Sequence, residues 1–281
     1  MLREPKLAEP RPTELHPGEV EIPGVAPPLV QKADAKPFEH RAEPSALPEL
    51  MDAPCSYEEF RACLRDLEQV NRFTQAYGPT LGFLERVVSQ ESTPRGTLRI
   101  LDVGAGGGDM LRRIARWARE QKVDVDLTGV DLNPHSTRAA REFSQKTRGS
   151  RRDAEGIRWV NGDALHYDPP GGVDLILSAL FTHHLESPES VRFLAWMERT
   201  ARVGWFINDL YRSQRAARWF RVLPILFRWH KFVRHDGPVS LQRAFTAADW
   251  QRYLADAQIS GASVESHAFN RLCVARIREL A

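Results

Sequence analysis

Residues 98–110, LRILDVGAGGGDM, join an apolar run, a glycine-rich turn and the first part of an amphipathic pattern. The apolar run from Leu98 to Val103 predicts a buried parallel strand, and the helical spacing of apolar residues from Met110 to Trp117 predicts a helix directly after the turn. Glycine adopts positive φ at little cost and has no Cβ, so the turn can bring bare backbone close to a ligand. The order strand, glycine turn, helix is typical of α/β proteins that bind a cofactor.

An acidic residue follows at the distance that such a site requires. Residues 125–131, VDLTGVD, predict a second apolar strand that ends in Asp131. In this class of fold the end of that strand lies beside the glycine turn, where a carboxylate can accept two hydrogen bonds from vicinal ribose hydroxyls. The turn alone could simply close a tight strand–helix connection, so the acid is what favours a nucleoside-like ligand.

Four motifs in order make the chain resemble the class I S-adenosylmethionine-dependent methyltransferases. They are ILDVGAGGGDM (100–110), GVDLNP (129–134), NGDAL (161–165) and VDLILSALFTHHL (173–185). Dehydrogenases of the Rossmann type share the glycine turn and the acid, but their fingerprint is G-x-G-x-x-G. Here the glycines follow the pattern Gly104-x-Gly106-x-Gly108, which favours the methyltransferase.

The resemblance implies a binding site for S-adenosylmethionine. Asp102 and the glycine-turn backbone would face the methionine portion, Asp131 the ribose, and Asp163 the adenine amino group. Taken alone, Asp163 is better explained as a turn acid, and only the ordered set of motifs favours the adenine role. The cofactor-binding residues implied are Asp102, Gly104, Ala105, Gly106, Asp131, Leu132, Asp163, Ala164, Ser178 and Leu180.

Apolar and amphipathic segments alternate from residue 98 onward. This alternation predicts a Rossmann-like α/β fold with a doubly wound, seven-stranded sheet, mostly parallel and finished by a C-terminal antiparallel hairpin. Thr246 and Asp249 form a capping-box pattern at the start of the last helix. The predicted strands are 98–103, 125–130, 157–160, 173–178, 203–208, 262–269 and 271–277, and the predicted helices are 108–121, 134–147, 188–201 and 245–257.

Composition divides the chain at residue 48. Residues 1–48 hold ten of the nineteen prolines and predict a disordered extension. Residues 49–281 predict one methyltransferase domain with N-terminal helices over 56–90 and a lid-like insert over 211–244. The N-terminal helices begin with a Ser56–Glu59 capping box, are interrupted at Gly78-Pro79, and either roof a substrate pocket or cover the sheet.

Bulk properties exclude several classes of function. The formal net charge of +2 gives no reason to expect nucleic acid as a partner. No apolar run has the length of a membrane span, and no secretory signal is visible, so we expect a cytoplasmic protein. The three cysteines have neither metal-ligand spacing nor an even number for a disulfide framework, which also fits a reducing compartment.

Methyl transfer to a hydroxyl requires removal of a proton, so a base is expected near the ends of the later strands. His183 and His184 follow the fourth predicted strand, and Asp209 follows the fifth. We predict these three as catalytic residues. The alternatives are that the histidines only shape a loop and that Asp209 caps the next helix. Two adjacent histidines without further ligands predict no metal site.

Residues 211–234, YRSQRAARWFRVLPILFRWHKFVR, mix basic and apolar side chains and contain no acid. Three interpretations remain open: a lid over an apolar pocket, an interfacial helix that contacts anionic lipid, and core packing with snorkelling arginines. Nucleic acid binding is a weaker fourth. Pro224 is expected to kink or split the helix, and His235-Asp236-Gly237-Pro238 predicts a turn. We predict Trp219, His235 and Arg243 as substrate-binding residues.

These observations predict a bacterial-type methyltransferase of secondary metabolism that needs no metal. Its acceptor is expected to be a small, largely apolar molecule of polyketide or quinone type, with O-methylation of an aromatic hydroxyl favoured. Two alternatives stay open: C-methylation of a quinone-like ring, and a catalytically silent module that only binds the cofactor. The sequence carries no signal for an oligomeric state.

Overall fold

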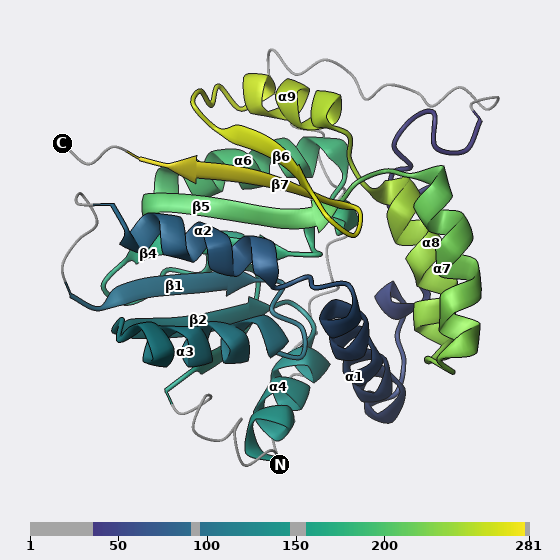
Figure 1. Cartoon of the computed structure of the whole chain (residues 1–281), viewed down its shortest axis with the longest axis horizontal. Coiled ribbons are helices and arrows are strands. Elements are labelled where there is room, and N and C mark those ends of the chain that lie inside the picture. Colours follow the sequence, from purple (N-terminus) through teal and green to yellow (C-terminus); the bar gives the residue numbers. More distant parts are fainter. Residues whose placement is uncertain (1–35, 91–95, 147–155, 279–281) are drawn as a thin grey trace, which may run out of the picture. The chain divides into compact units, whose positions relative to one another are not determined.

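In the described part of the chain, seven strands form one sheet in the order β3-β2-β1-β4-β5-β7-β6 (Figure 1). The computed structural model describes residues 36–90, 96–146 and 156–278. Strands β1 to β5 are parallel, and β7 runs antiparallel to both β5 and β6. The predicted fold class is confirmed. The strands are β1 (Leu98–Val103), β2 (Val125–Asp131), β3 (Arg158–Asn161), β4 (Val173–Ala179), β5 (Ala201–Leu210), β6 (Ser263–His267) and β7 (Arg271–Ile277).

The strand order reverses direction at β1. The chain passes from β1 outward through β2 to β3, then returns to place β4 on the other side of β1. Val103, at the end of β1, is paired with Val130 on one side and with Ser178 on the other. In an open parallel sheet, ligands bind in the crevice outside the strand ends at such a reversal.

Both faces of the sheet are covered, because neighbouring residues of the central strands point to opposite sides. Ile100 belongs to the apolar cluster packed by α2 and α3, and Leu101 to the cluster packed by α6 and α9. Continuous apolar strands are therefore expected, and burial along β4 is continuous up to Ser178. The helices next to the sheet are α2 (Gly78–Val88), α3 (Asp109–Gln121), α4 (Pro134–Lys146), α6 (Ser187–Thr200) and α9 (Ala247–Asp256).

The turn after β1 needs glycine for two different reasons. Gly106 has φ of 52°, a region that costs a side-chain-bearing residue free energy. Gly108 has φ of 73°, and a Cβ there would lie 2.2 Å from the ring of Trp159. Conformation and close packing together fix where the backbone of this turn lies.

The N-terminal helices begin as predicted but break elsewhere. Ser56 caps α1 (Tyr57–Phe73) by accepting a hydrogen bond from the Glu59 amide. The break lies at residues 74–77, and Pro79 is in the first turn of α2, where a missing N–H costs nothing. Asn208 of β5 donates to the Ala76 carbonyl and so ties this break to the sheet.

The predicted boundary of the disordered extension is wrong. Residues 1–35 lie outside the described residues, but the described structure begins at Lys36 and already includes a buried arginine, Arg41. Its guanidinium donates to the carbonyls of Leu185 and Arg243. Such partners are remote in sequence, so composition alone does not reveal them. A short 3-10 helix, η1 (Leu50–Asp52), follows.

The predicted insert folds as two helices, α7 (Gln214–Leu226) and α8 (Lys231–Arg243), which pack against each other (Figure 1). The chain leaves α7 two residues after Pro224. The turn predicted at 235–238 is wrong, because these residues lie inside α8. Gly237 packs so closely on Phe220 of α7 that a Cβ would lie 2.1 Å from that ring, a tertiary contact that overrides the local turn signal. None of the described helices is long and apolar enough to cross a membrane.

Candidate active site

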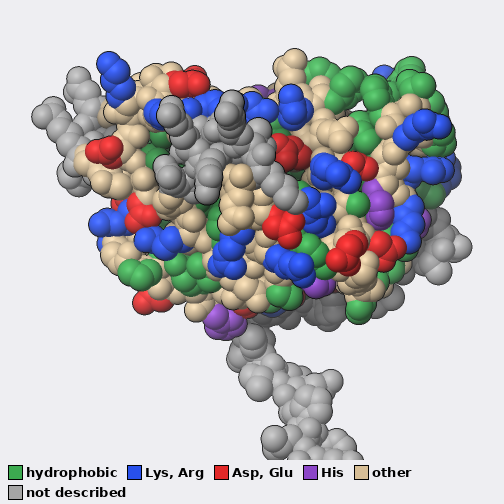
Figure 2. Space-filling model, turned by 90° about the horizontal axis from the view of Figure 1, so that it is seen from below, with side chains coloured by type: hydrophobic (Ala, Val, Ile, Leu, Met, Phe, Trp, Pro, Cys, Tyr) green, Lys and Arg blue, Asp and Glu red, His purple; other side chains and the backbone are tan. Residues whose placement is uncertain are grey.

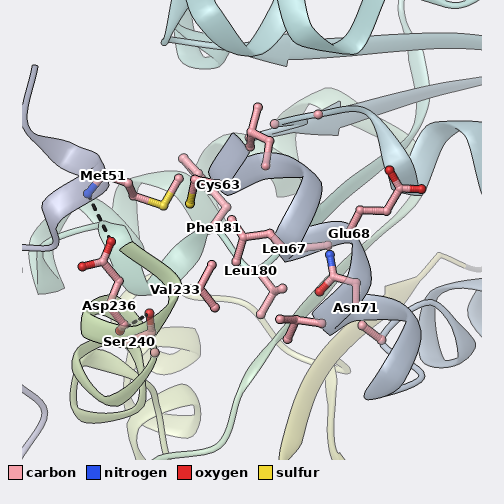
Figure 3. Close-up of a pocket in the computed structure, with 18 of the residues that line it drawn as sticks. Met51, Cys63, Leu67, Glu68, Asn71, Leu180, Phe181, Val233, Asp236 and Ser240 are labelled. Atoms are coloured by element: carbon pink, nitrogen blue, oxygen red, sulfur yellow. Dashed lines mark hydrogen bonds between the residues drawn. The ribbon is translucent and has the colours of Figure 1, made fainter. Parts of the chain in front are cut away.

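A cavity of about 960 Å³ lies at the carboxyl ends of β1, β2 and β4. One end is polar and is lined by the glycine turn. The other end is apolar and is roofed by η1, α1, α7 and α8. Figure 3 shows Met51, Cys63, Leu67, Leu180 and Val233 of this apolar end gathered from these elements and the loop after β4.

The polar end is organised by Asp131. Its carboxylate accepts hydrogen bonds from the amides of Gly106, at 2.8 Å, and Asn133, at 2.9 Å. Burial raises the pKa of Asp131, although these backbone donors oppose the shift. The side chain is therefore fixed against the turn and lines the cavity, as the interpretation as a ribose ligand requires.

Asp102 lies deeper at the same end. It is 2% exposed, and its Oδ1 has no hydrogen-bond partner among the described residues. Burial, with Asp109 and Asp131 nearby, raises the pKa of Asp102 well above its ordinary value. An acceptor left unpaired in a cavity wall fits a cationic ligand group such as the ammonium of a bound amino acid.

The other predicted cofactor residues divide into two groups. The first group lines the cavity and consists of Gly104, Ala105, Leu132 and Leu180. Leu132 is 75% exposed, so its side chain is open to pack against a flat ring such as adenine. Asp163, Ala164 and Ser178 do not line the cavity. Asp163 caps the short helix η2 (Ala164–His166), Ala164 belongs to the apolar core, and the Ser178 hydroxyl donates to the Val103 carbonyl. Their contact with the cofactor stays a prediction.

His183 is oriented by Asp209. The short helix η3 (Thr182–His184) follows β4, and His183 Nδ1 lies 2.7 Å from Asp209 Oδ1. Thr182 and the His183 amide both donate to the other carboxylate oxygen of Asp209. Burial alone raises the pKa of Asp209, but His183 and Thr182 hold it well below its ordinary value.

Asp209 is thus a positioning residue and not a catalytic one. It is fully buried and does not line the cavity, whereas His183 does. The alternative role as a helix cap is also wrong, because Ser213 caps α7. From behind the cavity wall, the Asp209 carboxylate orients the His183 side chain through the hydrogen bond at Nδ1.

His184 lies in a charged cluster with Glu49 and Asp52, which directly follow the segment predicted to be disordered, residues 1–48. Its Nδ1 is 3.1 Å from Asp52 Oδ1, and its Nε2 is 3.8 Å from Glu49 Oε2. Burial lowers the pKa of His184, but the carboxylates of Glu49 and Asp52 outweigh burial and raise it. Glu49 lines the cavity and is only 3% exposed.

Of the three predicted substrate-binding residues, one lines the cavity and two do not. Trp219 of α7 lines the cavity mouth and is 70% exposed. Arg243 does not line the cavity: it is fully buried and binds Asp52 at 3.0 Å and the His183 carbonyl. His235 is paired with Asp236 and is also outside the lining. Both roles are corrected, because the predicted loop that would have carried them is part of α8.

Sequence reasoning missed Glu49, Asp52 and much of the apolar wall. Glu49 precedes the first capping box, in a segment without periodicity. The apolar wall could have been found, since the stripe of α1 was visible and one interpretation placed α1 over the pocket. Cys63 and Val70 of α1 pack with Phe232 and Val233 of α8 and with Trp229, which lies just before α8, so the two segments form one roof.

Comparisons with known proteins agree with this geometry. Residues 100–204 match the protein-family model described as a methyltransferase domain. A curated protein, the indolepyruvate C-methyltransferase of Streptomyces griseus, is 32% identical over 105 residues, which cover 37% of this chain and 30% of that protein. The match spans less than a third of the relative's length.

Solved structures share the fold at low identity. A SAM-dependent methyltransferase from Aquifex aeolicus has a TM-score of 0.52 at 17% identity, over 79% of this chain and 98% of that chain. The plantazolicin methyltransferase BpumL, solved with SAH and a monoazolic analog, has a TM-score of 0.52 at 14% identity, over 79% and 96%. These likenesses show a common fold.

The buried His183–Asp209 pair predicts a pH-dependent loss of stability. Asp209→Asn should lower the free energy of unfolding by about 3 kcal/mol at pH 7, since it breaks a buried pair. The pKa of Asp209 is lower in the folded state than the unfolded value of about 3.9, so its carboxylate stabilises the fold above that pH and stops doing so as the pH falls. The difference from wild type should therefore shrink below about pH 4.

Urea unfolding at pH 7 and at pH 3 measures this difference. Asp168→Asn, a change at an exposed aspartate, is the control and should shift stability by less than about 0.5 kcal/mol. Equal stability of Asp209→Asn and wild type at pH 7 would contradict the anchoring role.

Proposed function

We propose that this chain is a class I S-adenosylmethionine-dependent methyltransferase, which transfers a methyl group from S-adenosylmethionine to a small, largely apolar acceptor; the match of residues 100–204 to a methyltransferase domain supports the proposal. One observation carries the proposal. A single cavity joins the glycine turn and Asp131 at one end to an apolar chamber under α1, α7 and α8 at the other. A polar nucleoside and an apolar acceptor can therefore bind next to each other in one cavity.

The chain's own residues fit the cofactor. Bound S-adenosylmethionine supplies an electrophilic methyl group on a sulfonium sulfur. Asp131 would accept hydrogen bonds from the ribose hydroxyls, and Asp102 would accept from the ammonium group. Gly106 lets the backbone approach, since a Cβ there would find its nearest neighbour at 3.7 Å and project into the space the ligand needs.

The chamber favours an aromatic acceptor with a hydroxyl group. Its lining is mostly apolar, with Phe60, Leu67, Phe181, Phe220 and Trp229 among the contributors. Since aromatic walls bind flat apolar molecules and exclude water, we propose O-methylation of an aromatic hydroxyl. C-methylation of an electron-rich ring is the second candidate, and the printed name of the curated relative, a C-methyltransferase, favours it.

The histidine pair would handle the acceptor proton. His183 and His184 both line the cavity, and each has a carboxylate beside its Nδ1. A carboxylate on Nδ1 fixes the tautomer and raises the basicity of the imidazole. His184 is the more accessible of the two, with a side chain 24% exposed.

The outer face of α7 supports a membrane contact. Trp219, Val222, Ile225, Leu226 and Phe227 are exposed there, and Leu226 is 73% exposed. Figure 2 shows hydrophobic side chains gathered at the right, the end to which α7 and α8 belong in Figure 1, with Lys and Arg beside them. The exposed arginines of α7 and the turn after it are Arg215, Arg218, Arg221 and Arg228.

Apolar side chains beside arginines match an anionic lipid surface, and residues 211–234 contain no acid to oppose it. The inner face of the same helix lines the cavity through Phe220 and Leu223. We therefore propose a cytoplasmic enzyme that touches the membrane through α7 and receives an apolar acceptor there, with α7 also serving as the lid.

The activity is tested directly with labelled cofactor. The full chain is incubated with methyl-labelled S-adenosylmethionine and a panel of phenols, quinones and lipids. His184→Ala should lower kcat by about 10²–10⁴-fold, the usual contribution of a positioned acid or base, and leave cofactor affinity nearly unchanged. His267→Ala, on the edge strand β6, is the control and should keep full turnover. Cofactor binding without transfer to any acceptor would favour the silent module.

Cofactor binding has its own test. Asp131→Ala should weaken S-adenosylhomocysteine binding by about 1.5–3 kcal/mol, the scale of hydrogen bonds to a charged group. Asp126→Ala, on the same strand but paired with Arg158 away from the cavity, is the matched control. Calorimetry that gives wild-type affinity for Asp131→Ala would refute the ribose role.

Membrane contact is measured by co-sedimentation with vesicles. The protein should bind vesicles that contain phosphatidylglycerol, and binding should weaken as salt rises. Ile225→Ser/Leu226→Ser should reduce partitioning at least about tenfold, since burial of each side chain contributes about 1.5–3 kcal/mol. Leu165→Ser, at an exposed leucine outside α7, should change nothing. Unaltered binding of the α7 variant would exclude this surface.

A further inference from the structure

Three side chains in the cavity wall bring potential metal-ligand atoms close together, an arrangement that proton transfer by a single histidine does not require. Glu49, His183 and His184 each offer one ligand atom, and these atoms all lie within 4.8 Å of one another. His183 Nε2 lies 3.9 Å from Glu49 Oε1, and His184 Nε2 lies 3.8 Å from Glu49 Oε2. These distances are too long for hydrogen bonds, so the two Nε2 atoms and the Glu49 carboxylate converge on a common point without hydrogen-bonding one another, while the two imidazole rings pack with centroids 4.4 Å apart.

Each imidazole is held from behind by a carboxylate. His183 Nδ1 is 2.7 Å from Asp209, and His184 Nδ1 is 3.1 Å from Asp52. In metalloproteins a ligating histidine almost always donates its other ring N–H to such a partner, which fixes the tautomer and aims the free nitrogen at the ion. His183 has this arrangement, and His184 has it with the Arg243 guanidinium also 3.2 Å from its Nδ1. The Nε2 atoms of both histidines face the carboxylate of Glu49.

Glu49 is fixed as well. The Ser240 hydroxyl donates to Glu49 Oε1 at 2.7 Å, and Arg243 lies 3.4 Å from the same oxygen. Oε2 is the oxygen nearer to His184. The Glu49 side chain also forms a capping box with Asp52 at the start of η1, so its carboxylate is held in place from two sides.

The charges around the cluster favour a cation. Three carboxylates, those of Glu49, Asp52 and Asp209, belong to the cluster or contact its histidines. The guanidinium of Arg243 is paired with Glu49 and Asp52, whereas that of Arg41 is paired with Glu43 outside the cluster. With neutral imidazoles, these three carboxylates and Arg243 have an excess of two negative charges, which a divalent ion would balance.

We propose that Glu49, His183 and His184 bind a divalent transition-metal ion, with zinc as the best match. Two histidines and a carboxylate form the ligand set of open zinc sites, in which a further position stays available to substrate. All three residues line the cavity, so that position faces the acceptor chamber. The sequence predicted no metal because the two histidines lacked a third ligand nearby; the fold brings it from η1.

The role of the ion, though not its binding, rests on the proposed function. An ion at this place supplies positive charge beside the acceptor, which lowers the pKa of an acceptor hydroxyl. The imidazoles would then act as ligands, and turnover would still depend on His184.

The test is a zinc titration of the full chain without cofactor or acceptor. Protein stripped with a chelator is titrated with zinc chloride by calorimetry, and the absorption spectrum of the cobalt form is recorded. We expect one saturable site per chain and a cobalt spectrum without thiolate charge transfer. Glu49→Gln/His184→Ala should abolish the site, and Asp209→Asn, which keeps all three ligands, should weaken it about 10- to 100-fold.

The matched control is Glu265→Gln/His267→Ala. This surface pair has the same 3.8 Å spacing between imidazole and carboxylate but no place in the cluster, so its loss should leave zinc binding unchanged. If the double variant does not fold, the single change His184→Gln, at a partly exposed side chain, takes its place. Absence of a saturable site in wild type, equal binding by the cluster variants, or thiolate ligation from Cys55 and Cys63 would each overturn the proposal. Methyl transfer, measured separately, can succeed or fail independently.

Discussion

The hydrogen bond from the Gly106 amide to Asp131 is the interaction on which the site depends. It joins the turn after β1 to the end of β2 and so fixes the polar wall of the cavity at the reversal of strand order. The bond forms only because Gly106 adopts positive φ, which places its amide against the carboxylate. In the proposed complex, a ribose that donates to Asp131 would meet a side chain already oriented by the Gly106 and Asn133 amides and already partly desolvated.

A second, buried network builds the opposite wall. Arg41 and Arg243 both donate to the His183 carbonyl of η3, and Asp236 accepts hydrogen bonds from the Leu50 and Met51 amides of η1. The segment before α1 is thereby fastened to α8 and to the loop after β4. This is why Glu49 faces the histidine pair, and why residues 36–52 belong to the chemistry of the site and not to a linker.

The sequence predicted what local pattern controls. The strand β1 before the glycine turn, the turn itself, Asp131 at the end of β2 and the Thr246–Asp249 capping box follow from periodicity and short-range chemistry, and the structure has them at the predicted places. The sequence did not predict the roles of residues whose partners lie far away along the chain. Arg243 is a buried structural cation, not a substrate ligand, because its partner Asp52 lies far away in sequence. The turn signal at 235–238 failed because Gly237 packs on α7.

If a sulfur-bearing nucleoside and an acceptor share this cavity, a crystal structure of the full chain with S-adenosylhomocysteine should show both parts of the site. We expect ribose oxygens on Asp131, the amino group on Asp102, and the sulfur facing the chamber under α1, α7 and α8. A nucleoside bound with its sulfur turned away from that chamber, or outside the cavity altogether, would contradict it.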